Sequence, residues 1–396
     1  MTKYHNTVII IAQKVLKLKG FEVLESQKKV AWLNTVRVFA SLTVILSHYV
    51  LLEQIEVSHE KIHWALAGIG HIGIILFFAV SGYLASNSLQ RSKNVFEFYR
   101  RKLIRIIVPF SVAYIVLGMF FILLGIVEPT LAQRSPFYNV IYVGGIFRGI
   151  LFSILPIDAN LIMYFALPSY WFVGEWFIGM IIYMYLIAPL LDKILRYNFF
   201  VAIILSLLLS WTVYNLTFPL QASKNITSWW IFIVRAPEFL LGMAFFVYRD
   251  FILKYRAKII SASAILIFAF SILLYIYGDT KAPFFVLLCF DHPIDFMFSL
   301  PMIYLFFTFA EWLNEKFSAV LANFNSFSDI SYVMMLIQRI VIELFADSFD
   351  FTNLSNFGIF FMFMLIVLTI IFVSQKIHDI YKPIEEWMIK NFLVRK

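Results

Sequence analysis

The sequence is poor in charged residues and in cysteine. Only 14% of its 396 residues are charged, against roughly 25% in soluble domains, and 62% are hydrophobic. A single cysteine, Cys289, excludes an intramolecular disulfide. The apolar residues form long runs without the period-two alternation of a membrane β-barrel. Because lipid offers no hydrogen-bond partner to an exposed strand edge, we expect an all-α integral membrane protein.

The apolar runs predict a bundle of about ten transmembrane helices. The membrane domain is expected over residues 31–374, followed by a cytoplasmic tail over 375–396. Residues 1–30 hold six lysines among aliphatic residues, which predicts a basic amphipathic segment on the cytoplasmic face. The expected spans are 31–52, 64–85, 103–127, 171–191, 198–217, 229–248, 259–277, 284–309, 331–346 and 355–374.

Basic residues are distributed unevenly between alternate connections. The connections assigned to the cytoplasm carry 24 Lys and Arg, and the opposite set carries five. By the positive-inside rule, both termini are predicted to be cytoplasmic. The net charge of +8 therefore follows from membrane topology, and we expect no nucleic-acid partner.

Two regions fit the simple pattern less well. Residues 140–157 are apolar but interrupted by glycines and an arginine, which predicts a re-entrant or interfacial segment. The eighth expected span contains Asp291, His292, Pro293 and Asp295, which favours a broken or water-lining helix.

The first expected span contains Arg37 and His48. An ionisable side chain in hydrocarbon is costly and is by default a functional hypothesis. The two residues lie about 16 Å apart along a helix axis, about half of a hydrocarbon core. The predicted orientation places Arg37 toward the cytoplasm and His48 in the outer half of the membrane.

Several segments together resemble the membrane acyltransferase-3 family. The resemblance covers residues 31 to about 374, and its motifs come in the family's order. They are Arg37 with His48, FFAVSGYL (77–84), RKLIRIIVP (101–109), WFIGMIIYMYLIAP (176–189), RAPEFLLGMAF (235–245) and ISYVMMLIQ (330–338). The resemblance implies a bacterial, multi-pass enzyme of the inner (cytoplasmic) membrane. Its expected reaction transfers an acetyl or other acyl group from acyl-CoA, most often acetyl-CoA, to a sugar hydroxyl of a surface polysaccharide or its lipid-linked precursor.

The resemblance suggests roles for the inner and outer ends of the first span. His48 is the expected general base for the acceptor hydroxyl, since histidine titrates near neutral pH. Arg37, Arg101, Lys102 and Arg105 are expected to bind the phosphates of coenzyme A. The alternatives are a helix-packing histidine, an arginine that snorkels to lipid headgroups, and a basic loop required by topology alone.

Other polar residues are expected in the outer half of the bundle. Glu175, Asp291 and His292 are candidates for binding the sugar, and Glu175 or Asp291 could orient the imidazole. Arg235 and Glu238, three residues apart, are expected to neutralise each other. Ser81 is expected to permit close helix packing rather than to act as a nucleophile. The sequence contains no glycine-rich phosphate loop and no zinc-ligand spacing, and we expect no metal.

Two positions depart from the family pattern. Ile181 stands where many members carry a glutamate, and Gln338 stands where the motif often ends in histidine. Both departures put particular substrate or accessory roles in doubt. A transporter or flippase of a glycan or glycolipid precursor is the alternative function, because it would also show many helices and buried charges.

Overall fold

The computed structural model describes residues 32–52, 60–138, 172–224, 231–277, 295–321, 324–351 and 354–393. Regular secondary structure in these ranges is helical, and no strand occurs in them. The predicted all-α class is therefore confirmed for this part of the chain. The amphipathic segment predicted in 1–30, the predicted re-entrant segment 140–157, and Asp291 and His292 lie outside the described residues.

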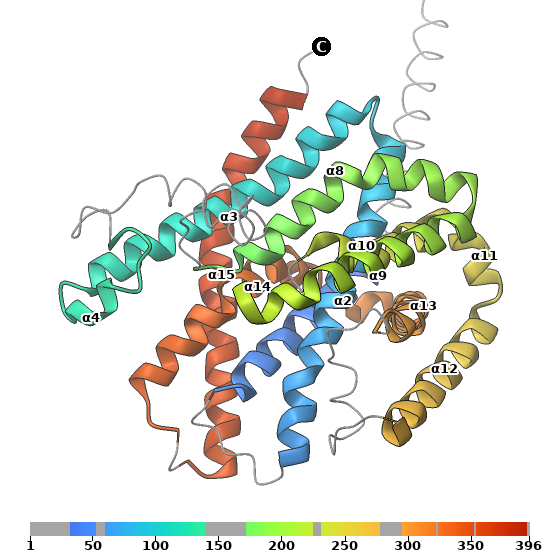
Figure 1. Ribbon diagram of the computed structural model, residues 1–396. Coiled ribbons are helices and arrows are strands. Elements are labelled where there is room, and N and C mark those ends of the chain that lie inside the picture. Colours follow the sequence, from blue (N-terminus) through green and yellow to red (C-terminus); the bar gives the residue numbers. More distant parts are fainter. Residues whose placement is uncertain are drawn as a thin grey trace, which may run out of the picture.

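The helices pack into one bundle, with α12 standing at its edge (Figure 1). The chain begins in this bundle with the helix Trp32–Val50, called the first helix below. The helices that follow are α2 (Glu60–Arg91), α3 (Val95–Leu124), α4 (Pro129–Ala132), α8 (Glu175–Tyr197), α9 (Phe199–Lys224), α10 (Phe232–Val247), α11 (Arg249–Lys254), α12 (Arg256–Tyr277), α13 (Asp295–Leu321), α14 (Phe324–Ser348) and α15 (Asn356–Leu393).

Six helices in the described residues are long and apolar enough to cross a membrane. They coincide with six of the ten expected spans, and the other four expected spans fall on α10, α12, α13 and α14. The count of ten is therefore not confirmed. One reason is length, because α10 has 16 residues and a hydrocarbon core needs about 20. The six are Trp32–Val50, Gly68–Arg91, Val95–Leu124, Glu175–Tyr197, Phe199–Thr217 and Asn356–Phe392.

Two glycines allow α2 and α10 to pack backbone against backbone. A Cβ atom at Gly82 would overlap the carbonyl oxygen of Phe239, and one at Gly242 would overlap that of Ala79. Small residues permit such close approach in membranes, where dispersion contacts rather than hydrophobic exclusion hold helices together. The glycine after Ser81 therefore has the packing role predicted for this pair.

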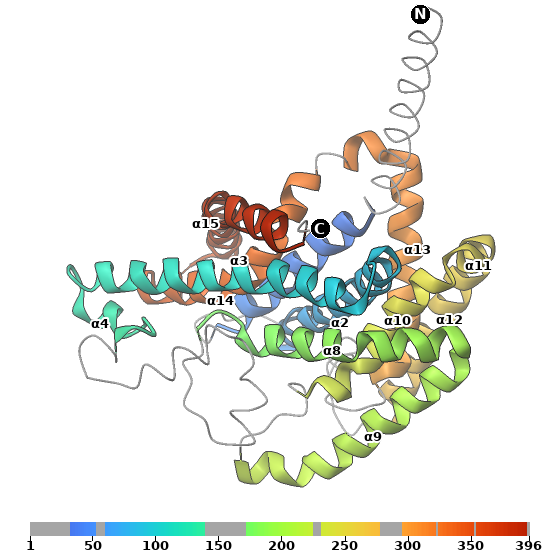
Figure 2. The same cartoon turned by 90° about the horizontal axis from the view of Figure 1, so that it is seen from above.

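The basic connections gather at one end of the bundle. Arg91, Arg196 and Arg249 line a single pocket of about 410 Å³, although they lie in the last turn of α2, in the last turn of α8 and at the start of α11 respectively. The start of α3 meets the end of α15, where Arg100 donates a hydrogen bond to the carbonyl oxygen of Phe392 (3.0 Å). α15 packs against α3, and the two helices cross at an angle (Figure 1 and Figure 2).

The opposite end joins connections predicted to lie on the other side of the membrane. Arg134, which follows α4, forms an ion pair with Asp347 near the end of α14. The Tyr49 hydroxyl at the end of the first helix donates to the carbonyl oxygen of Ile359 (2.6 Å). Alternate connections thus meet at opposite ends, as the charge pattern requires, and the membrane side of each end stays a prediction.

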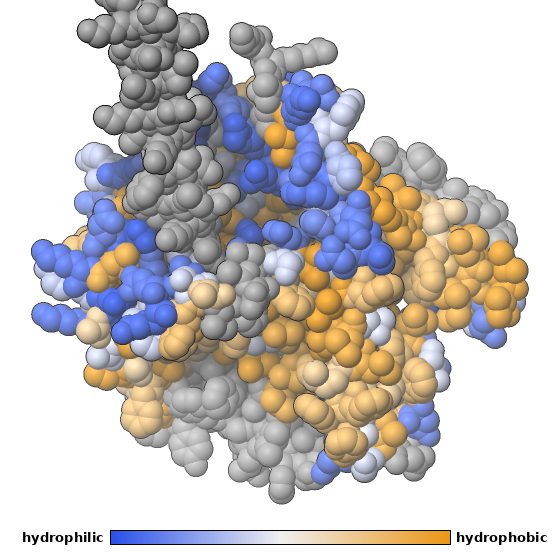
Figure 3. Space-filling view, turned by 180° about the vertical axis from the view of Figure 1, so that it is seen from behind, coloured by the Kyte–Doolittle hydropathy of each residue, from blue (hydrophilic) through white to orange (hydrophobic). Residues whose placement is uncertain are grey.

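The surface has a hydrophilic part and a hydrophobic part. In Figure 3, hydrophilic residues gather over the upper part of the face and at its left edge, and hydrophobic residues cover much of the rest. Many large apolar side chains point outward from the long helices, for example Leu208 on α9 and Phe361 on α15, both about 58% exposed. Such contiguous apolar surface suits contact with lipid.

Candidate functional site

A cavity of about 490 Å³ lies beside His48. The first helix, α2, α3, α8 and α14 contribute to its walls, together with Arg134. Val44 and His48 lie one helical turn apart and both face the cavity. Its charged, imidazole and amide side chains are His48, Arg134, Glu175, Gln338, Arg339 and Glu343.

Aromatic rings line another part of the cavity. Phe121 comes from α3, Phe172 from the segment before α8, and Trp176 and Phe177 from the first turn of α8. The rings of Phe121 and Phe172 meet edge to face with their centres 6.0 Å apart. The combination of apolar walls with a few convergent polar groups is typical of small-molecule sites.

Glu175 fixes the start of α8 next to this cavity. Its two carboxylate oxygens accept hydrogen bonds from the backbone N–H groups of Phe172 (2.7 Å) and Val173 (2.9 Å). Gly174 precedes it with φ = 68°, a left-handed conformation that favours glycine. A carboxylate at a helix N-terminus is also stabilised by the helix dipole. Glu175 therefore lines the cavity with its oxygens bound to the backbone, and its role toward the sugar stays a prediction.

Ion pairs form part of the cavity wall. Glu343 accepts from Arg339 one turn earlier in α14 (2.7 Å) and lies 3.4 Å from Arg134. The sequence analysis did not select any of these three residues. The available signal was a pair of opposite charges four residues apart, Arg339 and Glu343, within the expected span 331–346.

Three cations predicted to bind coenzyme A lie near one another, toward the other end of the first helix from His48. Arg37 lies within electrostatic range of Arg105, and both lie within electrostatic range of Lys102. The Lys102 ammonium group donates to the carbonyl oxygen of Leu84 (3.0 Å) and lies 4.7 Å from the ring centre of Tyr185. We call Arg37, Lys102 and Arg105 the cationic cluster.

Acidic and phenolic groups surround this cluster. The Arg105 guanidinium lies 3.7 Å from Glu385 of α15. Arg37 is within electrostatic range of Asp329 and Tyr381, and the Tyr381 hydroxyl donates to the backbone carbonyl of Asp329. The cluster therefore joins the first helix, α3, α14 and α15 at one level.

Arg101 is directed away from the cationic cluster. Its guanidinium binds Glu97, one turn earlier in α3, at 2.6 Å. Glu97 also accepts the backbone N–H of Lys93 (2.9 Å), and the Asn94 side chain accepts the N–H of Glu97 (2.9 Å). This reciprocal capping fixes the carboxylate at the start of α3, where it holds Arg101.

Ser81 also lies at the level of the cationic cluster. Its hydroxyl hydrogen-bonds with the phenol of Tyr185. That phenol in turn lies within electrostatic range of Arg37. The serine thus contacts a phenol rather than the imidazole that a serine nucleophile would need, in agreement with the packing role predicted for it.

An aromatic layer lies between the two levels. Phe177 lines the His48 cavity, and its ring packs against those of Phe78 (centres 5.1 Å apart) and Phe77 (5.9 Å). All three side chains are buried. The described lining of the cavity includes none of Arg37, Lys102 and Arg105. The single cavity predicted to join Arg37 and His48 therefore stays a prediction.

Arg235 and Glu238 form the neutral pair that their spacing predicts. Their side chains are buried and 2.7 Å apart, and the Ser299 hydroxyl donates to the same carboxylate (3.2 Å). His71 lies within electrostatic range of Arg235. This group does not line the His48 cavity. Among the described residues, no group of three or more His, Cys, Asp or Glu could hold a metal ion.

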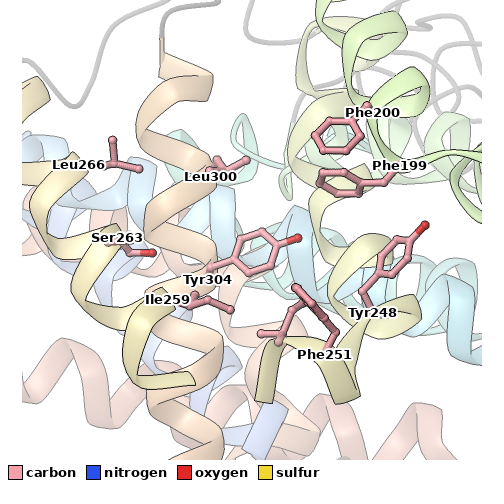
Figure 4. A pocket seen from close by; sticks show the side chains of 11 residues that line it. Phe199, Phe200, Tyr248, Phe251, Ile259, Ser263, Leu266, Leu300 and Tyr304 are labelled. Atoms are coloured by element: carbon pink, nitrogen blue, oxygen red, sulfur yellow. The ribbon is translucent and has the colours of Figure 1, made fainter. Parts of the chain in front are cut away.

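A second, apolar pocket of about 590 Å³ lies between α9, α10, α11, α12 and α13. Figure 4 shows its wall of aromatic and aliphatic side chains, with Phe199 and Phe200 on one side and Ser263 and Leu266 on the other. Its described lining includes no charged side chain and no imidazole. The His48 cavity is therefore the better candidate for a reaction site.

Comparison with known families agrees with the predicted resemblance. A family model described as "Acyltransferase domain", that of the acyltransferase-3 family, matches residues 30–375. This match includes the first helix, the cationic cluster and the whole wall of the His48 cavity. Neither a curated protein nor a solved structure matches the chain. The chain belongs to the acyltransferase-3 family of membrane proteins.

Proposed function

We propose that the protein is an acyl-CoA-dependent O-acyltransferase of a bacterial cytoplasmic membrane. Its donor is acetyl-CoA or another acyl-CoA, and its acceptor is a sugar hydroxyl of a cell-surface polysaccharide or of the lipid-linked precursor. One observation carries this proposal. The first helix bears a histidine in a polar and aromatic cavity and an arginine in a cationic cluster at a second level.

The cavity suits a sugar acceptor. Its volume of about 490 Å³ lies within the range of roughly 300–1,000 Å³ that small-molecule sites occupy. The faces of Trp176 and Phe172 offer apolar surface for the C–H face of a pyranose ring, and polar groups nearby can bind hydroxyls. Asp291 and His292 remain predicted acceptor ligands.

The cationic cluster suits the phosphates of coenzyme A. Guanidinium groups bind phosphate oxygens in a bidentate manner, and an ammonium group adds a compact charge. In our proposal Arg37, Lys102 and Arg105 bind the diphosphate, and Arg101 contributes from its position beside Glu97. The pantetheine arm then extends toward His48, and passing the aromatic layer requires Phe77, Phe78 or Phe177 to move.

The proposed reaction is a direct transfer. The His48 imidazole takes the proton of the acceptor hydroxyl while the hydroxyl oxygen attacks the thioester carbonyl carbon. A new C–O bond forms, the C–S bond breaks, and the proton held by the imidazole passes to the coenzyme A thiolate. The products are an O-acyl sugar and free coenzyme A. No acyl-enzyme intermediate is needed.

The test uses the protein in liposomes with acetyl-CoA and glycan extracted from cells that lack the protein. Release of free coenzyme A should depend on the glycan, and mass spectrometry should detect an acetyl group on the glycan. His48→Ala should abolish both signals and retain binding of coenzyme A. Full transfer by His48→Ala would refute the proposed base. Movement of glycan across the membrane without thioester consumption would favour a transporter.

A further inference from the structure

Gln338 presents an unpaired polar atom at the His48 cavity. The side chain is 4% exposed, and its Oε1 atom accepts no hydrogen bond from the described part of the chain. Gln338 nevertheless lines the cavity. Nearly all buried polar atoms in folded proteins have a partner, because an unpaired one keeps the cost of losing its water. This oxygen therefore needs a donor that comes from outside the described residues.

Gln338 lies on the face of α14 that lines the cavity. Met335, Gln338 and Arg339 follow one another at helical spacing on this face. Neighbouring Leu336 and Ile340 are buried and apolar, so they offer the amide oxygen no donor. Gln338 thus lines the same cavity as the imidazole of the first helix, while its Oε1 atom has almost no accessible surface.

The other hydrogen-bonding groups of the cavity already have protein partners. Both oxygens of Glu175 accept backbone N–H groups. Glu343 is held by Arg339 and Arg134. Among the described side chains that line the cavity, Gln338 is the one with a buried oxygen that accepts no hydrogen bond.

We propose that Gln338 is an acceptor-binding residue. A rotation of its amide brings Oε1 to the cavity, where it accepts a hydrogen bond from a sugar hydroxyl that neighbours the reacting one, while His48 faces the reacting hydroxyl. The inference rests on the proposed function and specifies the acceptor further: the sugar carries a second free hydroxyl near the acylated position. Sites built to bind a hydroxyl discriminate strongly against analogues that lack it.

The test compares two substitutions at this position. Gln338→Met keeps the length of the side chain and removes the strong acceptor, and Gln338→Glu keeps an acceptor oxygen. The matched control is Gln375→Met, because the Gln375 amide donates to Asp379 on the exposed side of α15. Each variant is reconstituted in liposomes with acetyl-CoA and with glycan extracted from cells that lack the protein.

Gln338→Met should raise KM for the glycan about tenfold, the factor that one hydrogen bond contributes, and leave KM for acetyl-CoA unchanged. Gln338→Glu and Gln375→Met should keep the glycan KM of the unchanged protein. The unfolding temperature of Gln338→Met should not fall, because no internal hydrogen bond is lost.

Two results would overturn this inference alone: an unchanged glycan KM in Gln338→Met, or a clear fall in its unfolding temperature, which indicates a structural partner. Absence of acyl transfer by the unchanged protein would overturn the proposed function and this inference with it.

Discussion

His48 and Glu175 line the same cavity, but both oxygens of the Glu175 carboxylate accept backbone N–H groups at the start of α8. These two hydrogen bonds hold the carboxylate against the backbone just before the helix. The geometry therefore favours Glu175 as the residue that fixes the N-terminus of α8 and, through it, the position of Trp176 in the cavity wall.

Glu175→Gln should lower stability without changing the catalytic base. An amide NH₂ in place of one oxygen faces a backbone N–H, so a buried hydrogen bond is lost at a cost of about 1–3 kcal/mol. We expect a lower unfolding temperature in detergent and an unchanged midpoint in the pH dependence of kcat. A shifted midpoint with unchanged stability would instead assign Glu175 to the imidazole.

His48→Gln should separate catalysis from binding. Glutamine has hydrogen-bonding groups but cannot act as a base near neutral pH, and general-base catalysis is worth roughly 10²- to 10⁴-fold in rate. We expect kcat to fall within that range while KM for acetyl-CoA stays unchanged. Steady-state kinetics with glycan acceptor measures both. A kcat close to that of the unchanged protein would exclude His48 as the base.

Arg105→Gln and Arg101→Gln should differ in their effects on the donor. Arg105 lies in the cationic cluster, and Arg101 is held by Glu97. We expect Arg105→Gln to raise KM for acetyl-CoA more than Arg101→Gln does, and added salt to reduce the difference by screening. Arg100→Gln is the matched control, because Arg100 binds the Phe392 carbonyl at the end of α15. An equal rise of KM for acetyl-CoA in all three variants would mean that donor binding depends only on the total positive charge of these arginines.

Gly242→Ala should destabilise the bundle. The added methyl group overlaps the Ala79 carbonyl oxygen, so α2 and α10 must separate, and forcing atoms into a packed interior typically costs about 1–3 kcal/mol. Thermal unfolding in detergent should show the loss. Gly358→Ala serves as the control, because its nearest neighbour is the side chain of Leu354 at 3.3 Å. Similar unfolding temperatures for the two variants would argue against close backbone packing.

Spacing along a single helix was enough to predict some features. The Arg235–Glu238 pair, the close packing at Gly82 and the cavity position of Glu175 each follow from local sequence or from a family motif. The direction of Arg101 did not follow, because Glu97 competes for it one turn earlier.

Contacts between distant segments could not be predicted from the sequence. Arg134 reaches the cavity from a connection after α4 and meets Glu343 more than two hundred residues later. In the sequence, Gln338 is only a departure from a family motif. The structure shows that it lines the cavity and that its oxygen has no hydrogen-bond partner among the described residues. The rings of Phe78 and Phe177 pack against each other from α2 and α8, a contact that periodicity along either helix does not reveal.

The packed rings of Phe77, Phe78 and Phe177 have a consequence for the membrane itself. A protein that binds one substrate from each side of a membrane, as proposed for this one, must not conduct protons or salts. Buried phenyl rings oppose such a leak, since stripping water from a small ion costs on the order of 20 kcal/mol in an apolar medium. The electrochemical gradient would thus persist while the two proposed substrate sites stay close together.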